Sequence, residues 1–172
     1  MIKRNYHTHS GFCDGIGTLK EYAQKAVKLG FMELGFSSHA PLPFFCHWVM
    51  KQENLLVYMN EVNDLKKEFQ DELTILLGLE ADYIPGISCP LSIKHENHLD
   101  YVIGSVHFLG KTQAGIFWAI DGDLEEFTDG VSFSFQGNYQ LAVKKYYSLV
   151  REMIKESPPD IIGHLDLIKK NN

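Results

Sequence analysis

The sequence predicts an α/β fold built from parallel β/α units. Its 172 residues are 45% hydrophobic and 22% charged, proportions that are typical of a globular protein with a hydrophobic core. Short apolar runs, as in strands, alternate with longer amphipathic runs, as in helices, and this order is typical of parallel sheets. Because no linker or change in composition divides the chain, we expect a single domain over residues 1–172.

Five strand patterns and three helix patterns follow one another along the chain. Thr18 can cap the first helix, and Gly30 can end it. The third strand pattern is apolar throughout, as expected of a strand that is covered on both faces. Residues 108–137 show no regular period, and we expect a long functional loop there. The expected strands span residues 2–6, 33–37, 73–81, 101–106 and 161–162, and the expected helices span residues 18–29, 55–70 and 138–156.

Charge and composition argue against several classes of protein. The net charge is -6, from 22 acidic and 16 basic residues, which disfavours tight nonspecific binding to nucleic acid. No stretch reaches the roughly 18 apolar residues of a membrane span, and residues 1–7 lack the apolar core of a signal peptide. Cys13, Cys46 and Cys89 are odd in number and widely spaced, so we interpret them as reduced thiols. We therefore expect a cytoplasmic protein that binds neither membranes nor nucleic acid.

Side chains of a type that binds metal ions stand at the ends of all five expected strands. His7 and His9 lie two residues apart after the first strand, so their side chains project from the same face. Imidazole nitrogen is a common ligand of zinc, and the carboxyl ends of parallel barrel strands form the active face. We therefore expect one shared metal site. The further candidates are His39 after the second strand, Glu80 at the end of the third, His107 after the fourth and His164 after the fifth.

Each of these residues also has a structural interpretation. A single histidine at a strand end is more often a residue of the core than a ligand, and the prediction depends on the repetition. Glu80 stands between Leu79 and Ala81, where an unpaired carboxylate would cost several kcal/mol that a metal ion removes. Asp14 could hold a turn with Gly15, but its short distance from the first histidine pair lets it reach the same pocket.

Three other histidines differ from this set. His95 and His98 fall in a polar stretch, and we expect them to face solvent. His47 lies among aromatic residues that could belong to the core or could line a substrate pocket.

Taken together, the motifs resemble those of the polymerase and histidinol phosphatase (PHP) superfamily. They are His-Thr-His-Ser with a following aspartate, Ser-Ser-His-Ala-Pro, Gly-Leu-Glu-Ala-Asp-Tyr, Gly-Ser-Val-His-Phe and Gly-His-Leu-Asp. The resemblance covers the whole chain and implies a distorted (β/α)7 TIM-like barrel, of which about five strands are visible here. Family members continue to a late Asp-x-His motif that is not found after His164. We therefore expect the chain to correspond to about the N-terminal two thirds of the family's domain, and to an incomplete barrel.

The resemblance also implies a set of ligands for two to three divalent ions, which could be zinc, manganese or iron. Glu80 would bridge the first and second ions. By matching motif, the first ion would be held by His7, His9 and Glu80, the second by Glu80, His107 and His164, and the third by Asp14 and His39.

The branch of the superfamily with the most similar motifs implies hydrolysis of a small phosphate monoester, L-histidinol phosphate, to L-histidinol and inorganic phosphate, in histidine biosynthesis. Two ions about 3.5–4 Å apart can hold a hydroxide for attack on phosphorus, and Glu80 is the expected bridge between them. Because histidinol carries an imidazole and an amine, aromatic and acidic residues suit its pocket. The candidates are His47, Phe117, Trp118 and Asp121.

Two alternatives remain open at this point. The chain could be another phosphoesterase of the superfamily, such as a phosphotyrosine phosphatase, a broad phosphomonoesterase or a nuclease. It could also be a noncatalytic, truncated metal-binding remnant, because an open barrel exposes strand edges that invite pairing with another chain.

Overall fold

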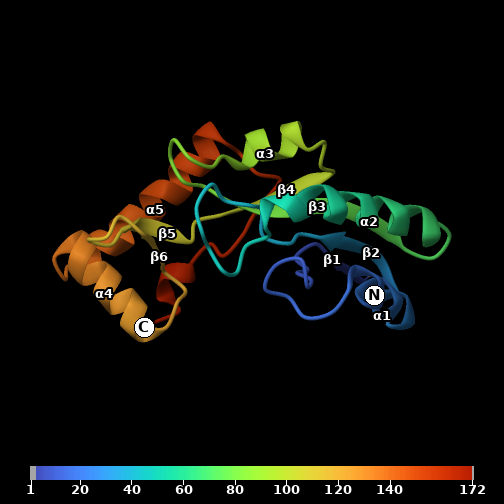
Figure 1. Cartoon of the computed structure of the whole chain (residues 1–172), viewed down its shortest axis with the longest axis horizontal. Coiled ribbons are helices and arrows are strands. Elements are labelled where there is room, and N and C mark those ends of the chain that lie inside the picture. The colour runs from blue at the N-terminus through green and yellow to red at the C-terminus, as the bar shows by residue number, and fades with distance from the viewer. Residues whose placement is uncertain (1–2, 172) are drawn as a thin grey trace.

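A curled half-barrel of five parallel strands forms the centre of the molecule (Figure 1). The computed structural model describes residues 3–171, so Ile2, the first residue of the first expected strand, lies outside the described residues. The strand order is β1-β2-β3-β4-β7, and all four pairings between neighbours are parallel. The parallel α/β prediction is therefore confirmed. The strands are β1 (Lys3–Asn5), β2 (Phe31–Phe36), β3 (Thr74–Asp82), β4 (Tyr101–Ser105) and β7 (Ile161–Ile162).

Within the described residues, five α-helices connect and cover the strands. In Figure 1, α1 and α2 lie at one end of the molecule and α4 and α5 at the other, with the strands between them. The Thr18 side chain accepts a hydrogen bond from the Glu21 N–H, and the Glu21 carboxylate accepts one from the Thr18 N–H, so α1 begins with a capping box. The helices are α1 (Leu19–Lys28), α2 (Leu55–Glu68), α3 (Pro90–Glu96), α4 (Leu124–Phe135) and α5 (Tyr139–Glu156), with 3-10 turns at Gln52–Asn54 and Leu167–Lys169.

Two of the three apolar clusters within residues 3–171 lie toward the two ends of the molecule. The first packs α1 and α2 against the sheet, with Leu19, Val62 and Leu77 among its buried residues. The second joins α4 and α5 to the segment after β4, and it contains Trp118 and Tyr146. The third is formed by residues that follow β2, β3 and β4.

The expectation of a long loop over residues 108–137 was wrong. This segment forms an antiparallel pair, β5 (Phe108–Lys111) and β6 (Phe117–Ala119), followed by α4. Helix α4 is capped by Asp123, whose side chain accepts the Glu126 N–H. Gly130 would ordinarily weaken this helix, but a Cβ at that position would lie only 2.2 Å from the Trp118 ring. The sequence of α4 has no clear helical period, and its glycine is explained by the packing of the helix against Trp118.

A tyrosine on β4 packs against a glycine of β3 and a glycine of β2, the next strand beyond it. The Tyr101 side chain lies over both positions: a Cβ on Gly78 would come within 2.5 Å of its ring, and a Cβ on Gly35 would come within 2.8 Å of its ring. Its hydroxyl lies 2.7 Å from the carbonyl oxygen of Tyr6 and 3.0 Å from that of Phe36. The same side chain thus spans the sheet from β4 to the end of β1.

None of the helices within residues 3–171 combines the length and the apolar character that crossing a membrane requires.

We expect Gly78→Ala to lower the free energy of unfolding by about 1–3 kcal/mol, because the new methyl group would overlap the Tyr101 ring. Urea unfolding measures the change. In a Tyr101→Val background, which removes the ring, the same glycine substitution should cost much less. An equal cost in both backgrounds would show that the ring is not the cause.

Candidate metal centre

The carboxyl ends of the five parallel strands bring together the side chains that the motifs single out. Glu80 belongs to β3, the middle strand of the sheet, and His39 forms an isolated parallel bridge with it after β2 ends. His107 comes two residues after β4, and His164 two residues after β7. The backbone of Thr8, between the two histidines that follow β1, exchanges hydrogen bonds with Ser37 at 2.9 Å and 3.0 Å. This pairing holds both histidines beside the sheet.

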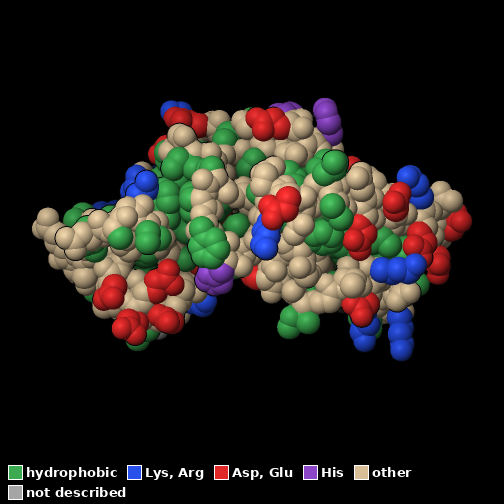
Figure 2. Space-filling view, viewed as in Figure 1, with side chains coloured by type: hydrophobic (Ala, Val, Ile, Leu, Met, Phe, Trp, Pro, Cys, Tyr) green, Lys and Arg blue, Asp and Glu red, His purple; other side chains and the backbone are tan. Residues whose placement is uncertain are grey.

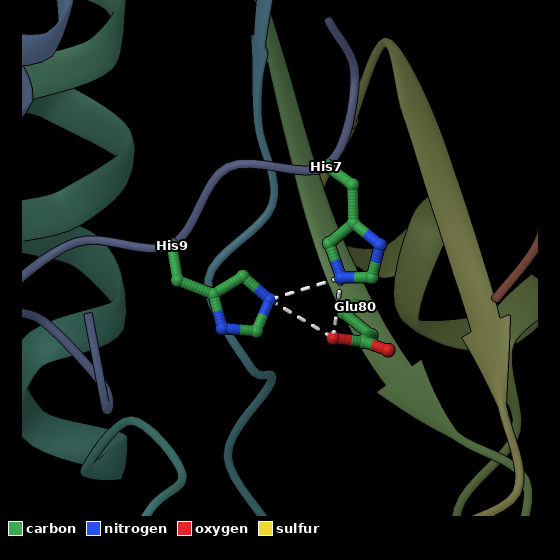
Figure 3. A group of neighbouring side chains, drawn as sticks. All are labelled: His7, His9 and Glu80. Atoms are coloured by element: carbon green, nitrogen blue, oxygen red, sulfur yellow. Dashed lines mark hydrogen bonds and ion pairs between the residues drawn. The ribbon is translucent and has the colours of Figure 1, made fainter. Parts of the chain in front are cut away.

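One oxygen of the Glu80 carboxylate faces the first two histidines. Its Oε2 lies 2.9 Å from His7 Nε2 and 3.0 Å from His9 Nε2. The two Nε2 atoms are 3.1 Å apart. Figure 3 shows both rings turned toward the carboxylate from the same short segment. Three ligand-type atoms therefore form a small triangle.

The other oxygen of Glu80 faces the last two strands. Its Oε1 lies 3.1 Å from His164 Nε2 and 3.8 Å from His107 Nε2, and it accepts a hydrogen bond of 2.6 Å from Ser105 Oγ. His164 has a left-handed backbone, with φ of 48°, and its carbonyl oxygen accepts a hydrogen bond from Tyr146. Such strain in a residue other than glycine is concentrated at functional sites. Glu80 itself is only 1% exposed, so each oxygen serves a different group of imidazoles in a buried position.

A third group forms around Asp14. Its carboxylate lies 2.8 Å from His9 Nδ1 and 3.8 Å from His39 Nε2. His39 is buried, and its other ring nitrogen, Nδ1, lies 3.4 Å from Glu80 Oε2 but makes no hydrogen bond among residues 3–171. A buried, unpartnered ring nitrogen is costly unless another group occupies it.

These donor sets fit divalent cations. A tetrahedral zinc ion with ligand bonds of about 2.1 Å has its ligand atoms about 3.4 Å apart, close to the spacing in the triangle of His7, His9 and Glu80. Three further groups have ligand atoms that all lie within 4.8 Å of one another. Imidazole with carboxylate suits zinc, iron and manganese alike. The further groups are His9, Asp14 and His39, then His39, Asp82 and His107, and then Glu80, His107 and His164.

Electrostatics in the cluster centre on the buried Glu80 carboxylate. Burial would raise the pKa of Glu80, but hydrogen bonds with the surrounding imidazoles, that of His164 first, hold it far below its usual range. Burial would lower the pKa of His9, but its interactions with Cys13 and with two carboxylates raise it to about 11. Burial lowers the pKa of His39 to about 4, so that ring is neutral near pH 7.

The sequence reasoning missed two residues that contact this cluster, and for a third it left a core role and a pocket role open. Asp82 accepts hydrogen bonds from His107, and its position two residues after Glu80 on the same strand places both side chains on one face. Ser105 likewise precedes His107 by two residues and reaches Glu80. Trp48 packs on the ring of His107 with centroids 5.3 Å apart, and no sequence pattern distinguishes it from a core aromatic residue.

A cavity of about 580 Å³ opens beside the cluster, and Asp14 and His39 are among its lining residues. Phe44 and Phe117 stack in its wall with centroids 4.7 Å apart. Figure 2 shows acidic side chains gathered over α4, at the rim of this region. The carboxylates of the lining residues give one side of the cavity a negative charge. The acidic residues in the lining are Asp14, Asp121, Asp123 and Glu126.

The other predicted residues are distributed as follows. His47, Phe117 and Asp121 line the cavity. Trp118 does not: its side chain is buried in the second apolar cluster, and its indole N–H donates to Ser134 on α4. The two neighbours differ because successive side chains of a strand point to opposite faces. His95 and His98 are exposed to solvent, as expected.

Comparisons with known proteins found similar sequences and similar structures. The family model of the PHP domain matches residues 5–172. A protein of Deinococcus radiodurans named "Probable histidinol-phosphatase" is 37% identical over 168 residues, which are 95% of this chain and 60% of that protein. The chain therefore spans about 60% of the length of this relative.

Two solved structures share the fold. The hisK protein of Listeria monocytogenes superposes with a TM-score of 0.80 at 28% identity, over 97% of this chain and 68% of that one. The histidinol phosphate phosphatase of Lactococcus lactis, solved with zinc, L-histidinol and phosphate, superposes with a TM-score of 0.68 at 26% identity. That alignment covers 96% of this chain and 59% of the other.

We expect Mn²⁺ at a hundredfold excess over its dissociation constant to stabilise the protein by about 2.7 kcal/mol, because the ion would bind the folded state alone. Thermal unfolding with and without Mn²⁺ measures the shift. Glu80→Gln should abolish most of it, because the variant keeps the shape of the side chain but loses the shared charge. His95→Ala, which changes an exposed histidine, should keep it. Equal shifts in the two variants would argue against the centre.

Proposed function

This chain belongs to the PHP domain family, and from that premise we propose that it is a metal-dependent phosphomonoesterase that hydrolyses L-histidinol phosphate to L-histidinol and inorganic phosphate. The observation that carries the proposal is the buried Glu80 carboxylate, both of whose oxygens face imidazoles: those of His7, His9 and His39 on one side and those of His107 and His164 on the other. The relative from Lactococcus lactis, which has the same fold, was solved with zinc, L-histidinol and phosphate. A role in histidine biosynthesis and a cytoplasmic location are part of the proposal, as the family resemblance implies.

The proposed ligand groups follow the geometry of the cluster. Divalent cations at these positions would lower the pKa of water and offset the negative charge of a phosphate ester. Zinc, manganese and iron all suit the donors, and we propose two or three ions. The proposed groups are His7, His9 and Glu80 for one ion, Glu80, His107 and His164 for a second, and Asp14 with His39 for a third.

Glu80 would act by holding these groups at a fixed separation. Its carboxylate is buried, and the Ser105 hydroxyl donates to one of its oxygens, so the side chain has little freedom to turn. Fixed charges in a site with little water stabilise developing charge without having to reorient during the reaction.

The cavity beside the cluster would bind the organic part of the substrate. Histidinol carries an imidazole and an amine, and the stacked rings of Phe44 and Phe117 offer a flat apolar face for the first. Asp121, on the acidic side of the same cavity, would attract the positive charge of the second. His47 lines the cavity as well and remains a candidate contact. The phosphate would then point toward Asp14 and His39, which join the cavity to the cluster.

Phosphate release tests the proposal. With Zn²⁺ or Mn²⁺ present, we expect the chain to hydrolyse L-histidinol phosphate with a higher kcat/KM than phosphotyrosine or a short oligonucleotide. Glu80→Gln and His107→Ala should each lower kcat/KM by more than about 100-fold, because each removes a ligand from the centre.

The control for this experiment is His95→Ala, whose exposed side chain is outside the cluster. It should retain full activity. Full activity in Glu80→Gln and His107→Ala would reject the proposed site. Equal or better hydrolysis of phosphotyrosine or the oligonucleotide would reject the proposed substrate while leaving the metal centre intact.

We expect Asp121→Asn to raise KM for L-histidinol phosphate about fivefold with little change in kcat, because a partly exposed charge interaction contributes about 1 kcal/mol of binding. Steady-state kinetics separate the two constants. Asp64→Asn, which removes an exposed charge from α2, is the matched control and should leave KM unchanged. If KM is unchanged in Asp121→Asn too, this carboxylate does not bind the substrate.

A further inference from the structure

Asp82 is the one carboxylate near Glu80, among the described residues, that the proposed ligand groups leave without a role. It ends β3, is 3% exposed, and lies two residues after Glu80 on the same face of the strand. Its side chain turns toward β4, where Ser105 is its partner in the strand register. A buried carboxylate without a function would be costly, so its contacts need an explanation.

Both contacts of Asp82 go to a single residue. The Oδ1 atom lies 2.8 Å from His107 Nδ1 and accepts the backbone N–H of His107 at 3.1 Å. His107 is 2% exposed, and its ring is confined by Trp48, His39 and His164, with centroids 5.3 Å, 5.4 Å and 5.4 Å away. The carboxylate thus fixes both the backbone and the ring of His107.

This contact has a chemical consequence for the other ring nitrogen. A neutral imidazole carries one N–H and one lone pair, and an ionised carboxylate can only accept. Facing Asp82, the Nδ1 atom therefore keeps the hydrogen, and the lone pair lies on Nε2. That Nε2 atom points toward Glu80 Oε1, 3.8 Å away, on the side of the group formed with His164.

We propose that Asp82 is a positioning residue that holds the His107 ring with its Nε2 lone pair toward a divalent cation shared with Glu80 and His164. This inference rests on the metal centre of the proposed function, but it does not depend on the substrate. Carboxylates in this role orient a ligating histidine and raise its basicity, and their loss lowers metal affinity about 10–100-fold.

Asp82 could instead be a ligand itself, because its carboxylate, His39 and His107 have ligand-type atoms within 4.8 Å of one another. The hydrogen-bond geometry favours the positioning role. A nitrogen that donates its hydrogen to Asp82 has no lone pair left for an ion on that side, and Oδ1 already accepts two N–H groups.

Titration with Co²⁺ distinguishes these roles, because its visible spectrum reports coordination and a competing chelator gives the affinity without any substrate. Asp82→Ala removes the acceptor, and we expect about 10–100-fold weaker binding at one site with the same number of ions at saturation. Asp82→Asn keeps an acceptor oxygen but loses the charge, so we expect it to recover part of this affinity. The matched control is Asp160→Ala, which likewise removes a carboxylate that accepts a backbone N–H, that of Val102 on β4, but is not part of any ligand group.

Several outcomes would overturn the inference. If both Asp82 variants bind Co²⁺ with the affinity and spectrum of the wild type, Asp82 does not position His107. If a variant binds one ion fewer at saturation, Asp82 is itself a ligand. If Asp82→Ala fails to fold, the decision falls to Asp82→Asn, whose affinity must then be weaker than that of the wild type. If the wild type binds Co²⁺ but does not hydrolyse L-histidinol phosphate, the proposed activity is rejected. The comparison of the Asp82 variants then still decides the positioning role of Asp82. A wild type without Co²⁺ binding would reject both.

Discussion

The burial of one carboxylate constrains the rest of this structure. Glu80 stands at the end of the middle strand, almost without contact to water, and a negative charge there is stable only beside positive partners. The segments that follow β1, β2, β4 and β7 supply the imidazoles that lie close to its two oxygens. The parallel sheet makes this possible, because all its strands end on the same side. The parallel order of the strands therefore determines both the fold and the position of the imidazoles around Glu80.

The sequence predicted most of the sheet and the cluster, but not the contacts between strands. The strand ends could be identified because each apolar run is followed by a histidine or ends in an acid, and His7, His39, Glu80 and His164 do converge. The role of Asp82 could not be predicted, because its partner His107 follows another strand and the register between the two is a property of the folded sheet.

The region after β4 shows a different limit of sequence reasoning. Phe117 and Trp118 are adjacent aromatic residues, and both were candidates for the substrate pocket, but only the first lines it. Their orientation depends on the pairing of β5 with β6, which the irregular spacing of the segment conceals. Gly130 reduces the helical signal of α4, and the reason for a glycine there is the ring of Trp118, which lies 12 positions earlier in the chain.

Tyr101, whose side chain crosses the sheet, offers a simple way for such a site to vary in evolution. Its phenol reaches the backbone of Tyr6, immediately before the first histidine, although β1 contributes only three residues to the sheet. Replacement of Tyr101 by phenylalanine would remove this hydroxyl and leave the ring over the two glycines. The backbone of Tyr6, which precedes His7, would then lose its hydrogen bond to β4. Natural selection could thus adjust the mobility of the His7 and His9 segment without changing the sheet that carries it.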